Sequence, residues 1–132
     1  MDPKEVWTAA AVLMGFQLTA FIWRLNRETE VRKSGGKNWL PPADYLSLAS
    51  MITIAFGVYA FPIAGYQFSL SSQQMFGLSV ILFVGYIFAL LSHYNLLFRG
   101  PTVLPGKFCT IQEFITILAT LVAAGLFITG VR

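Results

Sequence analysis

The side chains best suited to binding chemistry gather directly after the first apolar stretch of this 132-residue sequence. Arg24 and Arg27 open a charged run in which basic and acidic residues are mixed as far as Lys33. Guanidinium groups bind carboxylates and phosphates through paired hydrogen bonds, so the two arginines could hold an anionic ligand at a membrane surface. A run of this kind is more often a solvated loop that attracts anionic lipid. Both interpretations predict a basic segment at the membrane surface.

Three isolated polar residues offer less chemistry. His93, the only histidine, provides a single ligand, and a haem or metal would need further ligands from another chain, so we predict no metal site. Cys109, the only cysteine, excludes an intramolecular disulfide and is expected to be a small apolar filler near a helix start. Gln17 lies within the first apolar stretch, where we expect it to hydrogen-bond to a neighbouring helix or to line a cavity. No catalytic residue can be named from these three.

The composition indicates what must position these residues. Hydrophobic residues make up 56% of the chain and charged residues 11%, whereas an ordinary soluble domain has about 25% charged residues. A chain this short cannot bury so much apolar surface in its own core, so lipid must cover it. Residues 6–23, 45–98 and 114–131 contain no Asp, Glu, Lys or Arg, and the second run is long enough for two spans. We predict an all-α integral membrane protein, a four-transmembrane-helix bundle, with residues 1–132 as a single transmembrane domain.

Turn and cap signals set the expected helix bounds. Proline, glycine, serine and glutamine punctuate residues 62–74, which predicts a loop inside the long uncharged run. Asp2 is an expected N-cap, Ser71 and Thr110 each begin a capping-box pattern, and Asp44 suits the first turn of helix two. We therefore predict helices at about residues 3–25, 44–64, 72–98 and 111–131, with longer connections at 26–43 and 99–110.

Basic residues predict the orientation. Of the nine Lys and Arg residues, only Lys4 and Arg132 lie away from the connections that follow helices one and three. Lys and Arg concentrate in cytoplasmic loops of membrane proteins. We therefore expect a multi-pass protein with both basic loops in the cytoplasm and both termini on the non-cytoplasmic side.

The predicted spans are also empty of charge, which excludes some functions. Proton-coupled transporters place an ionisable side chain at membrane depth, and no Asp, Glu, Lys or Arg lies in the middle of a span here. A small multidrug-type proton antiporter is therefore excluded, and we expect no buried charge within the spans. The basic residues match no nucleic-acid-binding motif, so nucleic acid is not an expected partner.

Small residues at four-residue spacing predict close helix packing. Helix three has Gly85 and Ala89, and helix four has Ala119 and Ala123. Such faces let helix backbones approach one another in a bilayer. They could pack within one bundle, but a thin four-helix bundle also favours a homo-oligomer or membership of a larger membrane complex, with the lipid bilayer as the surrounding partner.

The overall plan resembles the MAPEG superfamily, the membrane-associated proteins of eicosanoid and glutathione metabolism. The shared features are a short chain, four spans, outside termini, a long basic loop after helix one and a short outer loop after helix two. Residues 93–99 (HYNLLFR) are similar to the end of the family's third helix, where a tyrosine stands beside a basic residue. Residues 104–107 (LPGK) and 124–127 (AGLF) are similar to some members as well.

The resemblance implies a trimer that binds a lipid or lipophilic ligand, or conjugates one, at the cytoplasmic interface. It adds Tyr94 and Arg99 to Arg24 and Arg27 as expected ligand-binding residues. Glutathione is implied as a cofactor by resemblance only. Catalytic members carry an Arg–Asn–Glu motif at the start of helix two, whereas residues 39–47 (WLPPADYLS) contain none of the three. Whether the chain is an enzyme is therefore left open.

Two alternatives come from other functional classes. The chain could be a non-catalytic accessory or structural subunit of a larger membrane complex, because almost all of it is devoted to spans. It could also be a small channel or carrier for a neutral substrate, with Gln17, Ser47, Ser50 and Thr53 facing an interior path, although hydroxyls in spans more often bond to a helix.

Overall fold

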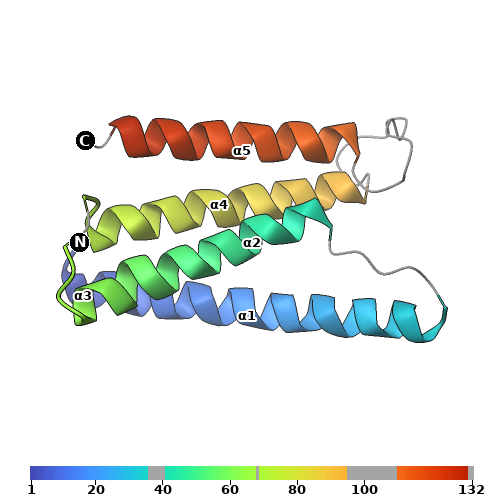
Figure 1. Ribbon diagram of the computed structural model, residues 1–132, viewed down its shortest axis with the longest axis horizontal. Helices are drawn as coiled ribbons and strands as arrows, with labels where there is room; N and C mark the ends of the chain where they lie inside the picture. The colour runs from blue at the N-terminus through green and yellow to red at the C-terminus, as the bar shows by residue number, and fades with distance from the viewer. Residues whose placement is uncertain (36–40, 68, 95–109, 131–132) are drawn as a thin grey trace.

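Four long helices lie side by side in the computed structural model, which describes residues 1–35, 41–67, 69–94 and 110–130 (Figure 1). Within these ranges, four helices are long and apolar enough to cross a membrane. They are Pro3–Lys33, Pro42–Ile63, Ser72–His93 and Ile111–Gly130. The predicted class, an all-α four-helix membrane bundle, is confirmed. The start of the first helix and the end of the last lie at the same end of the bundle (Figure 1).

The first helix is longer than the sequence predicts. Helix α1 spans Pro3–Lys33 and begins with the expected cap, in which Asp2 and Glu5 form a capping box. Instead of ending near residue 25, it continues through the charged run, and its last turns project beyond the other helices (Figure 1). Arg, Leu, Glu and Lys all favour helix, and the basic residues Arg32 and Lys33 suit its C-terminal dipole. Arg27 is therefore a helical residue, although the predicted bounds place it in the connection at 26–43.

The second span changes its helical geometry on the way through the bundle. It consists of α2 (Pro42–Ile52), a π-helix η1 (Thr53–Ala60) and a last short turn α3 (Phe61–Ile63). A Cβ atom at Gly57 would lie 2.9 Å from the Met75 Cβ, so glycine is what allows the start of the next span to approach η1. A turn at Gly65, with φ of 72°, then leads the chain away from the helix.

The third span occupies the centre of the packing. Helix α4 (Ser72–His93) begins with the predicted capping box, because Ser71 and Gln74 bond to each other's backbone N–H groups at 2.7 and 3.3 Å. Helix α5 (Ile111–Gly130) packs mainly against α4, while α1 and the second span pack on the other sides. The predicted ends at residues 98 and 131 lie outside the described residues.

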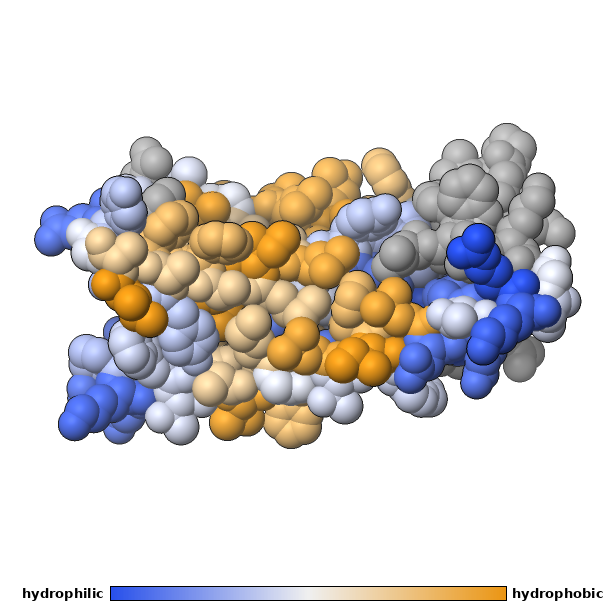
Figure 2. All heavy atoms as spheres, turned by 60° about the horizontal axis from the view of Figure 1, so that its bottom comes forward, coloured by the Kyte–Doolittle hydropathy of each residue, from blue (hydrophilic) through white to orange (hydrophobic). Residues whose placement is uncertain are grey.

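Two small apolar cores hold the spans together. One joins α2, α4 and α5 through a group of buried side chains: Ala43, Leu46, Leu82, Tyr86, Ala89 and Ala124. The other joins α1 to η1 through Val6, Ala10, Ile54 and Val58. Most other large apolar side chains point outward, and Figure 2 shows them as an apolar belt between two hydrophilic ends. A belt of this kind suits the hydrocarbon layer of a bilayer.

Candidate functional site

Arg24 is the centre of a buried ion pair near one end of the bundle. Its Nη2 donates to Oδ2 of Asp44 at 3.2 Å and lies 3.7 Å from a carboxylate oxygen of Glu28, one turn further along α1. Its Nη1 donates to the hydroxyl of Tyr94 at 2.5 Å. Arg24 is 4% exposed and Asp44 is 1% exposed. A buried charge needs a partner of opposite sign, and here α1 and α2 each supply one.

Three of the four predicted ligand-binding residues come together at this place. The guanidinium of Arg27 lies 5.2 Å from the centre of the Tyr94 ring, and that of Arg24 lies 5.8 Å from the same centre. These distances allow cation–π attraction. Arg27 is exposed, and no carboxylate of the described residues forms a salt bridge with it. The fourth predicted residue, Arg99, lies outside the described residues.

Glu113 is a second buried acid at the same end. Its Oε1 accepts from the backbone N–H of Ala43 at 3.0 Å, and its Oε2 lies 2.7 Å from Nδ1 of His93. Its own backbone N–H donates to Oγ1 of Thr110, as the predicted cap requires. The Glu113 carboxylate is fully buried. Its two oxygens contact two neighbouring helices, α2 through Ala43 and α4 through His93. Hydrogen bonds of this kind replace the water that a buried carboxylate has lost.

These contacts close into one connected group, which we call the polar ring: Arg24, Asp44, His93, Tyr94 and Glu113, with the Ala43 N–H. The ring contains residues from all four spans, and adjacent rings of His93 and Tyr94 complete it with a T-shaped contact at 5.1 Å. The expectation that the spans hold no buried charge is wrong for these helix ends. The charged residues stand at the edges of apolar runs, and contacts between the spans bury them there.

A separate polar contact lies deeper in the bundle. Gln17 is fully buried, and its Nε2 donates to the hydroxyl of Ser50 at 2.6 Å. The Ser50 hydroxyl in turn donates to the backbone carbonyl of Ser79 at 2.7 Å. The prediction that Gln17 bonds to a neighbouring helix is confirmed. Thr53 bonds to its own helix, at the Ala49 carbonyl, so these hydroxyls serve helix contacts.

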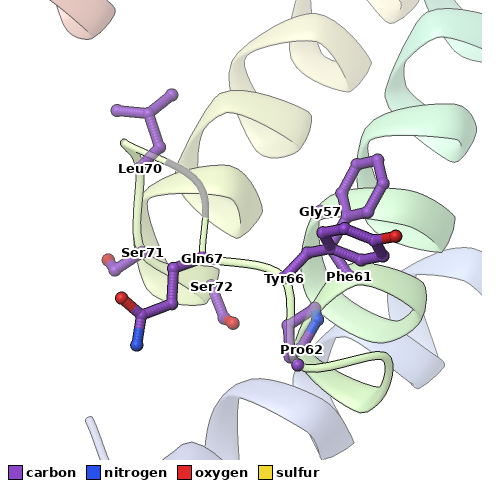
Figure 3. Close-up of a pocket in the computed structure, with 9 residues that line it drawn as sticks. Gly57, Phe61, Pro62, Tyr66, Gln67, Leu70, Ser71 and Ser72 are labelled. Carbon is purple, nitrogen blue, oxygen red and sulfur yellow. The ribbon is translucent and has the colours of Figure 1, made fainter.

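Two of the hollows in the described chain, both away from the polar ring, are a groove and a surface pocket. One, of about 410 Å³, is an apolar groove between α4 and α5, where Gly85 faces Thr120. The other, of about 400 Å³, lies at the opposite end beside the turn after α3. Figure 3 shows Phe61 and Tyr66 on one side of it and Gln67, Ser71 and Ser72 on the other. Neither of these two has a charged lining residue, whereas another hollow, at the start of α1, is lined by Lys4, Glu5, Thr8 and Ala9.

Sequence reasoning finds only part of this ring. Asp44 and Glu113 are expected merely as first-turn and cap residues, and His93 is considered only as a single metal or haem ligand. Their spacing along the chain carries no signal of contact, since Asp44 and Glu113 meet their partners through the packing of different spans. The available hint is that each is the only acidic residue at the start of its span, where an apolar neighbourhood makes an unpaired carboxylate costly.

Comparison with known protein families, with curated proteins and with solved structures finds no match in any of the three. The resemblance to MAPEG proteins therefore stays a prediction from topology and local sequence.

Proposed function

We propose that this four-span protein binds an anionic amphiphile, such as an acidic membrane lipid, at the end of the bundle that carries the polar ring. The observation that supports the proposal most directly is the position of Arg27. Its guanidinium is exposed, lies over the Tyr94 ring at 5.2 Å and has no salt bridge within the described chain. An arginine held against an aromatic ring at a membrane surface is suited to a phosphate or carboxylate headgroup.

Arg24 has a different part in this proposal from the one expected. Because Asp44 already pairs with it, Arg24 does not offer a free positive charge to an anion. It instead fixes the hydroxyl of Tyr94, and Tyr94 presents its ring to Arg27. The buried pair thus positions the aromatic platform, and the exposed arginine binds. We further propose that this end faces the cytoplasm, as the basic residues predict, and that the chain assembles as a homo-oligomer, as the MAPEG resemblance implies.

The test compares two charge-neutralising variants of α1. The purified protein is placed in phosphatidylcholine nanodiscs with a minor fraction of phosphatidylglycerol, and co-retained lipid and oligomeric mass are measured by native mass spectrometry. One arginine at the surface contributes about 1 kcal/mol to binding of acidic lipid, or roughly fivefold in affinity. Arg27→Gln should therefore lower the preference for phosphatidylglycerol by about that factor. Arg32→Gln, at an exposed position further along α1, should lower it less.

Two outcomes count against the proposal. Equal losses in both variants would indicate a general basic surface without a site. No preference for the acidic lipid in the unmodified protein would remove the proposed function altogether.

A further inference from the structure

Two polar atoms of the buried ion pair lack a hydrogen-bond partner in the part of the chain that the structure describes. They are Nε of Arg24, a donor, and Oδ1 of Asp44, an acceptor. Arg24 uses Nη1 for Tyr94 and Nη2 for the carboxylates, so the pair is joined through one nitrogen and one oxygen. An Arg–carboxylate pair can form two parallel hydrogen bonds, and this one forms a single bond. Leaving both remaining atoms unsatisfied away from water is costly.

The Arg24–Asp44 pair differs from the other buried side chains with an unsatisfied atom. The side-chain oxygens of Gln17 and Gln112 are each buried without a partner, but each is a single acceptor. Arg24 and Asp44 are hydrogen-bonded to each other, and together they have one unsatisfied donor, Nε, and one unsatisfied acceptor, Oδ1. Such a pair is complementary to a group that accepts one hydrogen bond and donates another. Because the charges already neutralise each other, it suits a neutral group better than a second anion.

We propose that the Arg24–Asp44 pair binds a hydroxyl of the ligand headgroup. The hydroxyl oxygen accepts from Nε–H of Arg24, and its proton is donated to Oδ1 of Asp44. The inference rests on the proposed function and makes it more specific, since the preferred ligand is then an anionic amphiphile that also carries a free hydroxyl. A hydroxyl is the simplest headgroup substituent that supplies both an acceptor and a donor at one atom.

The two binding groups adjoin each other. Arg24 and Arg27 both lie against the ring of Tyr94, at 5.8 and 5.2 Å from its centre, so one headgroup can place its anion at Arg27 and its hydroxyl at Arg24. Tyr94 is the C-cap residue of α4 and is 37% exposed. It is the exposed residue beside the buried pair, so a headgroup held at Arg27 lies next to that pair.

The decisive experiment uses two lipid probes of equal charge. Phosphatidylglycerol and phosphatidylpropanol with the same acyl chains differ in the headgroup hydroxyls that only the first carries. Each is offered to the unmodified protein in phosphatidylcholine nanodiscs, and bound lipid is quantified by native mass spectrometry. A site built for a hydrogen-bonding group rejects the analogue that lacks it. We expect phosphatidylglycerol to bind at least about tenfold more tightly than phosphatidylpropanol.

A matched pair of variants locates the effect. Arg24→Lys keeps the positive charge opposite Asp44 but removes the Nε–H donor, so it should abolish the preference for phosphatidylglycerol over phosphatidylpropanol. Arg32→Lys makes the same chemical change at an exposed position and should leave that preference intact. Circular dichroism establishes that each variant is folded. The comparison of lipids on the unmodified protein tests the inference even if Arg24→Lys does not fold.

The outcomes separate the two proposals. If both anionic lipids bind equally and more tightly than phosphatidylcholine, the hydroxyl site is overturned while anion binding remains. The same holds if Arg24→Lys and Arg32→Lys retain the same preference. If neither anionic lipid is preferred over phosphatidylcholine, the proposed function fails, and the hydroxyl site fails with it.

Discussion

The carboxylate of Glu113 caps a helix other than its own, because its Oε1 accepts a hydrogen bond from the backbone N–H of Ala43 at 3.0 Å. Ala43 lies in the first turn of α2, where backbone N–H groups have no partner within the helix. The last span thus satisfies a backbone group of the second. This contact also brings Glu113 to His93, and through it α4, so one side chain ties three spans together.

Removing this cap should destabilise the bundle. Glu113→Ala leaves the fully buried Ala43 N–H without its acceptor, and we expect a loss of about 1–3 kcal/mol in the free energy of unfolding. Glu113→Gln retains an oxygen at that place and should cost less. The measurement is reversible unfolding in mixed micelles of mild detergent and sodium dodecyl sulfate, followed by circular dichroism. If the glutamine variant is as unstable as the alanine variant, the cap is not what Glu113 contributes.

The ion pair between α1 and α2 predicts strong energetic coupling. Arg24→Ala leaves the buried Asp44 without an opposite charge and should destabilise by about 3–5 kcal/mol. Asp44→Ala should cost less, because Glu28 still lies 3.7 Å from the Arg24 guanidinium. The double variant has no unpaired charge and should cost less than the sum of the two, by about 1–3 kcal/mol. The same unfolding experiment provides this double-mutant cycle. Additive effects would show that the two side chains act independently.

Gly85 should be intolerant of a larger side chain. A Cβ atom there would collide with the side chain of Thr120 on α5, so α4 and α5 would have to separate. We expect Gly85→Ala to lower stability by about 1–3 kcal/mol. Gly125→Ala is the matched control, because a Cβ at that helical position meets no atom within 4 Å. A control variant as unstable as Gly85→Ala would mean that the loss comes from helix properties unrelated to packing.

The single cysteine offers a direct test of orientation. Cys109 lies outside the described residues, in the connection that is expected to be cytoplasmic from its basic residues. A membrane-impermeant maleimide should therefore label it only after the cells are permeabilised. As the control, Ser69→Cys in a Cys109→Ser background introduces an exposed thiol in the turn before α4, at the opposite end of the bundle. It should be labelled in intact cells. The reverse pattern would invert the predicted topology.

The four spans could be predicted because their signals are local. Uncharged runs of sufficient length, a proline and glycine turn, and caps at Asp2 and Ser71 each depend on neighbouring residues only. The end of α1 is predicted too early, because the prediction uses only the local change from apolar to charged residues. Hydropathy indicates where the chain leaves the apolar layer, but it does not indicate where the helix ends. The helix continues to Lys33 because residues 24–33 have side chains that favour helix in water as well as in lipid.

The polar ring could not be predicted in the same way. Arg24 and Tyr94 are 70 residues apart, and so are Ala43 and Glu113. Their contacts exist because four spans turn particular faces toward one another near this end of the bundle. Sequence spacing within a helix says which side chains share a face, but the facing of one span toward another depends on the packing of all of them. Arg24, Arg27 and Tyr94 were identified together only through a family resemblance.

The contacts of the polar ring become possible one after another as the spans are synthesised. Arg24 is made first and has no carboxylate from another span until Asp44 emerges with α2, while the Tyr94 hydroxyl arrives only with the end of α4. The Ala43 N–H is satisfied last, by Glu113 at the start of the final span. A chain halted before α5 would hold three inserted helices with an open polar edge. The contacts of the polar ring are therefore complete only when the last helix has entered the membrane.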